Sequence, residues 1–156
     1  MNWFKFFKTT PDKASSILYD EKTFYQAFFK DIKNAQSEVI IESPFISAKR
    51  AEKFYLIFTR ILDRGTKVLI ITRDPSDLDS ESRDIATNEI MHMADMGIDV
   101  KLVKGNHHRK IVIIDRKIIY EGSLNILSQN NSIELMRRFD SSKIANELIK
   151  FIKLKV

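Results

Sequence analysis

Short apolar runs alternate with segments of helical periodicity over the first two-thirds of this chain. The apolar runs are EVII at 38–41, KVLIIT at 67–72 and VKLV at 100–103. The segments with apolar residues at helical spacing are 20–34, 51–62 and 81–96. Alternating strands and helices build a sheet with right-handed crossovers and parallel neighbours. We therefore expect an α/β fold with a mixed, largely parallel central sheet and helices on both faces.

The pattern changes after residue 103. Residues 108–115 and 117–121 are predicted to be strands separated only by Arg116, which indicates a tight hairpin. A further strand is expected at 133–139 and a closing amphipathic helix at 141–155. The chain shows no internal repeat, linker or low-complexity tract, so residues 1–156 are expected to form a single domain.

Residues 1–19 are predicted to be an N-terminal arm, whose structure the pattern does not determine. Near its start it contains the aromatic and basic residues Trp3, Phe4, Lys5, Phe6, Phe7 and Lys8. One interpretation is an arm that packs on the domain or on a partner subunit. The alternative is a segment that touches a membrane surface.

Positive charge is concentrated in the last third of the chain. Residues 101–156 contain 12 Lys and Arg against 5 Asp and Glu, whereas residues 1–100 contain 14 against 16. Nucleic acid would be drawn to such a segment, although a basic surface can also be merely solvated. The chain has no cysteine and no apolar run of about 20 residues. We expect a cytoplasmic protein without stable membrane insertion.

The basic segment also contains a group of functional residues at fixed offsets. Within HRKIVIIDRKIIYEGSLN they are His108, Lys110, Asp115, Gly122, Ser123 and Asn125. Side chains alternate along a strand, so His108 and Lys110 are expected on one face. Asp115 has the opposite parity and is expected to hydrogen-bond at the turn, and as a motif residue it is also counted among the candidate catalytic residues. Gly122 would allow a close approach of backbone to ligand, or a positive φ.

These residue types can break a phosphodiester without a metal. The imidazole of His108 can attack phosphorus and form a covalent phosphohistidine. Lys110 would neutralise the non-bridging oxygens, and Ser123 and Asn125 would donate hydrogen bonds to them. Glu134, in SIELMRRF, could accept from the other ring nitrogen of His108. The leaving group needs a proton, for which a second histidine is the natural donor, but the chain has only one copy of the motif.

The other two histidines have simpler interpretations. His107 has the wrong parity to share the face of His108, and His92 lies in a predicted helix among methionines, so both are expected to pack or to lie on the surface. The three histidines lack carboxylates at metal-ligand spacing, and we predict neither a metal nor a cofactor. Each motif residue alone would most often be an ordinary surface residue, but six together favour catalysis.

The spacing H-x-K-x4-D followed by G-S-x-N resembles the signature of the phospholipase D superfamily. EVIIESPFIS, RGTKVLIITR and MGIDVKLV are similar to the scaffold that precedes the motif in that family, so the resemblance spans most of the chain. It implies a phospholipase D-like fold. The roles that it implies are nucleophile for His108, phosphate ligand for Lys110, Ser123 and Asn125, and histidine-orienting acid for Glu134. Ser132 stands where the family often has Asn.

Single-motif members of that superfamily resemble small bacterial endonucleases of the Nuc type, which complete their site by homodimerisation. The resemblance implies a homodimer with the two copies of His108 across one phosphate. The leading hypothesis is a metal-independent endonuclease acting on nucleic acid, with DNA preferred over RNA. One alternative is a phospholipase or phosphatidyltransferase. Another is a nucleic-acid-binding module that does not turn over a substrate.

Overall fold

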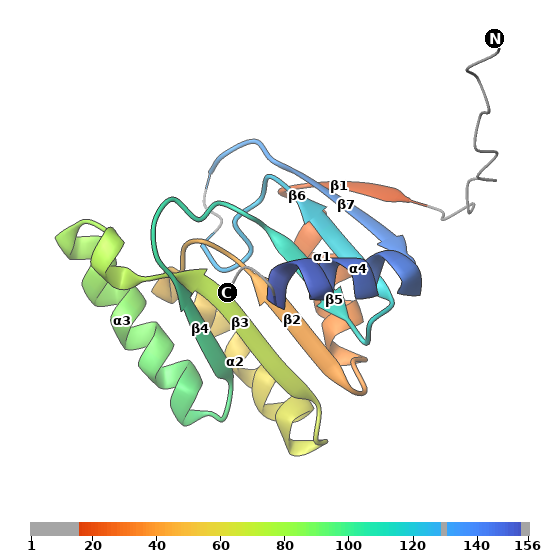
Figure 1. Cartoon of the computed structure of the whole chain (residues 1–156), viewed down its shortest axis with the longest axis horizontal. Coiled ribbons are helices and arrows are strands. Elements are labelled where there is room, and N and C mark those ends of the chain that lie inside the picture. The colour runs from red at the N-terminus through yellow and green to blue at the C-terminus, as the bar shows by residue number, and fades with distance from the viewer. Residues whose placement is uncertain (1–15, 129–130, 154–156) are drawn as a thin grey trace, which may run out of the picture.

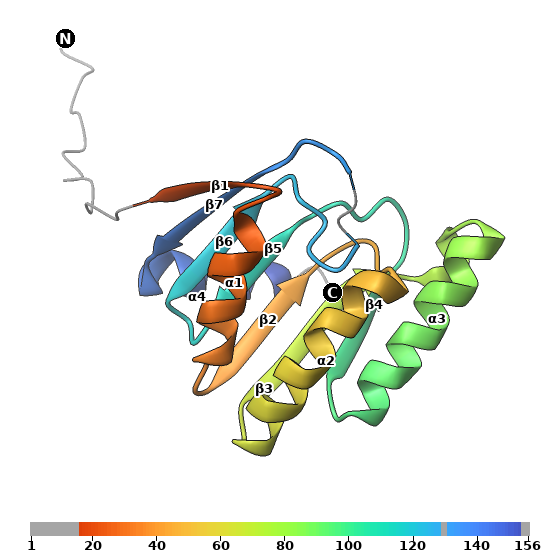
Figure 2. The ribbon, with the colours of Figure 1, turned by 180° about the vertical axis from the view of Figure 1, so that it is seen from behind.

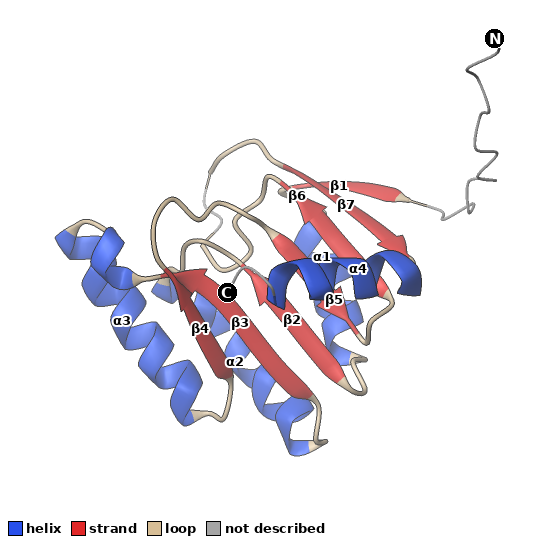
Figure 3. Cartoon of the chain, in the orientation of Figure 1, coloured by secondary structure: helices blue, strands red, loops and turns tan. Residues whose placement is uncertain are grey.

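The computed structural model describes residues 16–128 and 131–153, and within them it contains seven strands and four α-helices (Figures 1 and 3). The strands are β1 (Ile17–Asp20), β2 (Glu38–Glu42), β3 (Lys67–Arg73), β4 (Asp99–Val103), β5 (Ile111–Ile114), β6 (Ile118–Gly122) and β7 (Leu135–Asp140). The helices are α1 (Phe24–Lys33), α2 (Ala48–Asp63), α3 (Ser80–Asp95) and α4 (Ser142–Lys153), with a short 3₁₀ helix at Pro75–Asp77. The aromatic and basic residues 3–8 of the predicted arm lie outside the described residues, whereas its residues 17–19 belong to β1.

The strands form one mixed sheet in the order β1-β7-β6-β5-β2-β3-β4. Among the described strands, β3 pairs in parallel with β2 and β4, and the other four pairs are antiparallel. The prediction of a largely parallel sheet is therefore wrong, although the α/β class is confirmed. The reason is that no helix lies between β5, β6 and β7, so these consecutive strands return antiparallel to one another, and β5 also pairs antiparallel with β2.

Helices cover both faces of the sheet, as predicted. Figure 2 shows α1, α2 and α3 together on one face, and Figure 1 shows α4 crossing the other. The first face is rich in aromatic rings, among which those of Phe28 and Phe54 have centroids 5.9 Å apart. On the second face, Ala145, Ile149 and Ile152 of α4 pack against buried isoleucines of the sheet. None of the described helices has the length and apolar character needed to cross a membrane.

The region around Asp20 differs most from the predicted elements. A helix was expected from Asp20, but residues 17–20 form an edge strand that pairs with β7. Asp20 Oδ1 accepts hydrogen bonds from the backbone N–H groups of Lys22 (3.1 Å) and Thr23 (2.9 Å). These bonds close a turn between β1 and α1, so the helix begins only at Phe24 and Asp20 does not cap it.

The predicted hairpin is confirmed. β5 and β6 pair directly, and Asp115 and Arg116 between them have φ values of 52° and 53°. Two consecutive residues with positive φ are typical of a type I′ turn, whose twist matches that of the strands. This turn lies at the lower right of the sheet in Figure 1.

The opposite end of the sheet gathers the segments that carry most of the motif. The register places Glu42 beside Ile111, Arg73 beside Val103, and Gly122 beside Met136. The carboxyl ends of β2, β3, β4 and β6 therefore meet the amino ends of β5 and β7 here (top of Figure 1). Carboxyl ends of parallel strands are a common position for ligand sites in α/β proteins.

Candidate active site

His108 and Lys110 lie just outside the sheet. A strand was predicted from residue 108, but β5 begins at Ile111, which pairs with Glu42, the last residue of β2. After Glu42 the chain leaves the sheet at Ser43 and Pro44, so residues 108–110 have no continuing β2 strand to pair with. The strand prediction is wrong for these residues, and strand alternation does not determine where their side chains point.

A buried carboxylate lies beneath the two neighbours of His108. Glu42 is fully buried, and its Oε1 accepts a hydrogen bond from Arg109 Nε (2.7 Å) and forms an ion pair with Arg109 Nη2 (2.6 Å). His107 Nε2 lies 3.3 Å from the same oxygen. Burial raises the pKa of Glu42, and the bonds from Arg109 oppose that rise. Arg109 is therefore held from the sheet side and His107 is buried beside the same carboxylate, with the exposed His108 between them.

His107 is a packing residue, as predicted, and is almost completely buried. Burial, together with the nearby charges of Arg109 and Arg73, lowers the pKa of His107 to about 4. Its imidazole is therefore neutral near pH 7. His92 is exposed on α3, where its ring lies 4.4 Å from that of Tyr55.

Arg73 and Phe45 complete the support of this segment and were not identified from the sequence. Arg73 Nη2 donates to the carbonyl oxygen of His107 at 3.0 Å. The Arg73 guanidinium lies 4.8 Å from the centroid of the Phe45 ring, which in turn meets the ring of His108 edge-on at 5.9 Å. The available signal was a charged residue directly after an apolar strand, which occurs in both KVLIITR and EVIIE.

Lys110 is influenced by two charged residues from distant parts of the chain. Its Nζ donates to the carbonyl oxygen of His108 at 2.7 Å. Burial lowers the pKa of Lys110, Glu134 opposes this, and Arg73 lowers it further. Glu134 thus lies near Lys110, but in the part of the chain that the structure describes no hydrogen bond joins it to His108. Its proposed role in orienting that ring stays a prediction.

Ser123 and Asn125 lie in the loop that follows β6. Ser123 Oγ accepts a hydrogen bond from the backbone N–H of Leu135 at 3.1 Å, so its own hydrogen can still be donated. Asn125 Oδ1 is buried and has no hydrogen-bond partner among the described residues. Ser123 therefore retains donor capacity for a phosphate, and the role of Asn125 stays a prediction.

Gly122 is required by packing within the sheet. A Cβ at this position would lie 2.1 Å from the carbonyl oxygen of Leu135, on β7. The close approach seen at this glycine is to a neighbouring strand, and an approach to a ligand stays a prediction. The alternative expectation, a positive φ, is wrong, because the glycines with positive φ are Gly65, Gly97 and Gly105.

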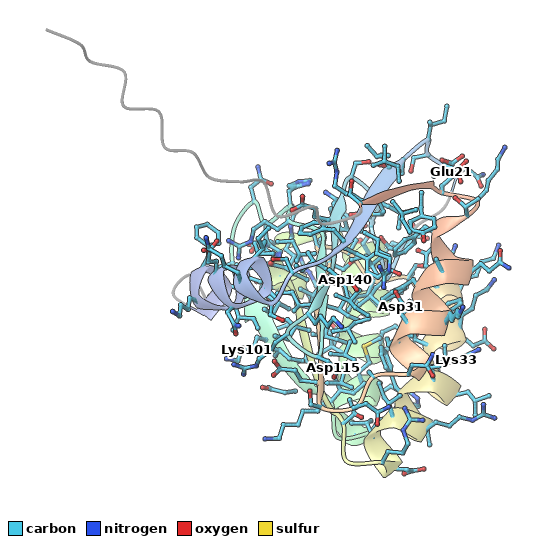
Figure 4. The ribbon with its side chains drawn as sticks, turned by 90° about the vertical axis from the view of Figure 1, so that its right-hand side faces the viewer. Glu21, Asp31, Lys33, Lys101, Asp115 and Asp140 are labelled. Carbon is cyan, nitrogen blue, oxygen red and sulfur yellow. The ribbon has the colours of Figure 1, made fainter. Side chains whose placement is uncertain are left out.

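Asp115 is not brought together with the other motif residues. It lies at the far end of β5. Glu21 marks the position of Glu134, because its carboxylate accepts a hydrogen bond from the backbone N–H of Glu134. Figure 4 shows Asp115 toward the opposite end of the molecule from Glu21. The Asp115 carboxylate accepts from the backbone N–H of Gln36 (2.9 Å), Ser37 (2.8 Å) and Glu38 (3.1 Å). Burial raises its pKa, but these hydrogen bonds lower it overall. Asp115 joins the hairpin to the loop before β2.

The surface around His108 is open. A hollow of about 420 Å³ is lined by His108, Lys110 and Gly122 among others, but not by Ser123, Asn125 or Glu134. The described residues include no group of three or more His, Asp or Glu side chains that could hold a metal ion. One chain thus presents His108 and Lys110 on an open surface, not inside an enclosed pocket.

A family model described as "Cardiolipin synthase, PLD-like domain" matches residues 28–154. The chain belongs to the phospholipase D superfamily. This membership supports phosphodiester hydrolysis as the general type of reaction. No curated protein sequence matches this phospholipase D-like chain.

Solved structures share its fold. Nuc from Salmonella typhimurium, a phospholipase D family member, superposes with a TM-score of 0.72 at 16% identity, over 92% of this chain and 94% of that one. NucT from Helicobacter pylori gives 0.71 at 18% identity, over 92% and 96%. TrmBL2, described as an archaeal chromatin protein with a novel mode of DNA binding, gives 0.61 at 12% identity, over 95% and 57%.

Proposed function

We propose that this protein is a metal-independent phosphodiesterase that cleaves nucleic acid through a covalent phosphohistidine at His108. The observation that carries the proposal is the arrangement of residues 107–109. Arg109 is bonded to the buried Glu42 and the carbonyl oxygen of His107 accepts from Arg73, while His108 between them is exposed. A rigidly held backbone with an accessible imidazole suits a nucleophile that must reach a phosphorus atom.

The reaction would proceed in two displacements. A ring nitrogen of His108 forms a bond to phosphorus, the bond from phosphorus to the leaving oxygen breaks, and a second imidazole protonates that oxygen. Water then gives a proton to the second imidazole, attacks phosphorus and releases His108. The ammonium of Lys110 and the donors of Ser123 and Asn125 would stabilise the charge on the non-bridging oxygens in both steps.

The second imidazole would come from another copy of the chain. His107 is buried with a pKa near 4, so it carries no proton to donate near pH 7. His92 lies in the last turn of α3, which leads to the amino end of β4 and thus away from the site. Beside Glu134, Ile133 is 93% exposed and Leu135 is 49% exposed. Exposed apolar side chains of this size favour a protein interface next to the site.

A nucleic-acid substrate, with DNA preferred, is favoured by charge. The excess of basic residues lies in residues 101–156, which contribute Arg109, Lys110 and Arg137 to the hollow beside His108. A polyanion would gain from releasing counterions along such a surface. The shared fold with Nuc, NucT and the DNA-binding TrmBL2 agrees with this substrate class. The family description favours one competitor, a phospholipid.

Incubation with defined substrates tests the reaction and the substrate. Labelled single- and double-stranded DNA and RNA, and vesicles of phosphatidylglycerol, would each be treated with the protein with and without EDTA. We expect cleavage of DNA at the same rate in both conditions, since no step uses a metal. Loss of cleavage with EDTA would contradict the mechanism. Turnover of lipid without turnover of nucleic acid would contradict the substrate.

Mixing intact and inactive subunits tests the shared site. Wild-type chain and His108→Ala chain, carrying different tags, would be co-expressed in varied proportions. A site that needs two copies of His108 is intact only in wild-type dimers, so activity should fall with the square of the wild-type fraction. A linear fall, together with a monomer in sedimentation, would exclude the shared site.

A further inference from the structure

A second hollow adjoins His108 through the ring of Phe45. It has a volume of about 260 Å³ and is lined by Phe45, Ile46, Ser47, Leu78, Ile85 and Ser128, among others. These residues come from the loop between β2 and α2, the start of α3 and the end of the loop after β6. None of them was assigned a role from the sequence. We call this hollow the Phe45 groove.

The Phe45 groove adjoins His108 through one side chain. The Phe45 ring both lines the groove and meets the ring of His108 at 5.9 Å. The Arg73 guanidinium makes a cation–π contact with the same ring, 4.8 Å from its centroid, and Arg73 donates a hydrogen bond to the carbonyl oxygen of His107. A group in the groove would therefore contact a side chain that packs directly against the nucleophile.

The size and lining of the groove suit a flat heterocycle. Drug-sized ligands occupy roughly 300–1,000 Å³, so this groove fits a smaller group. Phe45 supplies an aromatic ring, and Ile46 and Ile85 supply apolar walls. Ser47 precedes α2 but its side chain does not cap the helix, which leaves its hydroxyl for a ligand. An aromatic platform with apolar walls and hydroxyl groups matches the stacking face and polar edge of a nucleobase.

We propose that the Phe45 groove binds the nucleobase next to the phosphate held at His108. The proposal rests on the proposed function, because that function places the phosphate at His108 and Lys110. A phospholipid acyl chain would need a longer apolar channel than this short, serine-containing groove. A base reaches the groove only when it is unstacked, so the strand has to be unpaired at that nucleotide.

Paired esters with one common leaving group test the groove. The substrates are the 3′ and 5′ p-nitrophenyl phosphate esters of thymidine and the methyl p-nitrophenyl phosphate, which has no nucleoside. We expect kcat/KM for at least one thymidine ester to exceed that for the methyl ester by about tenfold, the scale of base stacking on an aromatic ring. In Ile85→Trp, whose ring would fill the groove, this ratio should fall to near one.

Met91→Trp is the matched control, because it adds the same ring to an exposed position of the same helix, α3, outside the groove. Its ratio should equal that of the wild type. The ratio is internal to each variant, so partial loss of folded protein does not alter it. Equal kcat/KM for methyl and thymidine esters in the wild type, or an unchanged ratio in Ile85→Trp, would contradict the nucleobase proposal. Neither result would contradict the proposed phosphodiester hydrolysis.

Two further outcomes separate the remaining explanations. If the wild type hydrolyses none of the esters and no nucleic acid, the proposed function fails and the groove proposal fails with it. If Ile85→Trp instead lowers hydrolysis of short-chain phosphatidylglycerol and spares the thymidine esters, the groove holds an acyl chain and the nucleobase is excluded.

Discussion

Replacement of His108 by alanine should lower the rate of nucleic-acid cleavage by roughly 10⁴–10⁶-fold, the range seen when a covalent nucleophile is removed. The imidazole supplies the nitrogen that bonds to phosphorus in the covalent intermediate, and Lys110, Ser123 and Asn125 cannot replace it. Only the acceleration from binding and charge stabilisation would remain. The measurement is the single-turnover rate on a labelled oligonucleotide, compared between the wild type and His108→Ala.

His92→Ala is the control for this loss. It removes an exposed imidazole from α3, remote from the site, and its rate should match that of the wild type. Acid quenching of a wild-type reaction, followed by mass spectrometry, should locate a phosphoryl adduct on the peptide that contains residue 108. An adduct elsewhere, or a His108→Ala variant within tenfold of the wild type, would refute the assignment of the nucleophile.

Replacement of Glu42 by alanine should lower the free energy of unfolding by about 3 kcal/mol, the lower end of the cost of breaking a buried ion pair. Glu42 is fully buried and Arg109 is 29% exposed at its side chain, so Arg109 would lose its partner while still largely desolvated. Cleavage should fall as well, because residues 107–109 would lose their anchor. Urea unfolding followed by circular dichroism measures the first effect, and single-turnover kinetics the second.

Variants of the same pair show whether charge or packing is responsible. Glu42→Gln retains a hydrogen-bond acceptor for Arg109 and should be less destabilising than Glu42→Ala. The double variant Glu42→Leu, Arg109→Met removes both charges and should regain stability relative to either single change, yet remain slow in cleavage. A Glu42→Ala protein within 0.5 kcal/mol of the wild type, the usual range for surface substitutions, would show that the anchor is unimportant.

Much of the fold could be predicted because its causes are local. Apolar spacing indicated the helices over 51–62 and 81–96, and the structure has them as α2 and α3 within three residues at each end. The hairpin followed from two strands with almost nothing between them. β1 escaped prediction because four exposed or half-exposed residues at a sheet edge, paired with a strand over 100 residues later, leave no periodic signal.

The residues of the candidate site were likewise predicted only in part. His108 and Lys110 were identified by type and spacing, and the structure places both at the end of the sheet. Glu42, Phe45 and Arg73 were missed, because each matters only through a residue far along the chain. Glu42 reaches Arg109 across 67 positions, and Arg73 reaches His107 across 34. No local pattern encodes such distances.

The amino-acid sequence by itself determined which chemical groups the chain can offer and which short segments become helix, strand or turn, since rotamer sterics, apolar spacing and turn geometry act over a few residues. Tertiary structure alone decided the direction of the strand pairs, the burial of Glu42 beneath residues 107 and 109, and the separation of Asp115 from His108. These depend on the order of strands in the sheet, which is set by the packing of the whole core at once.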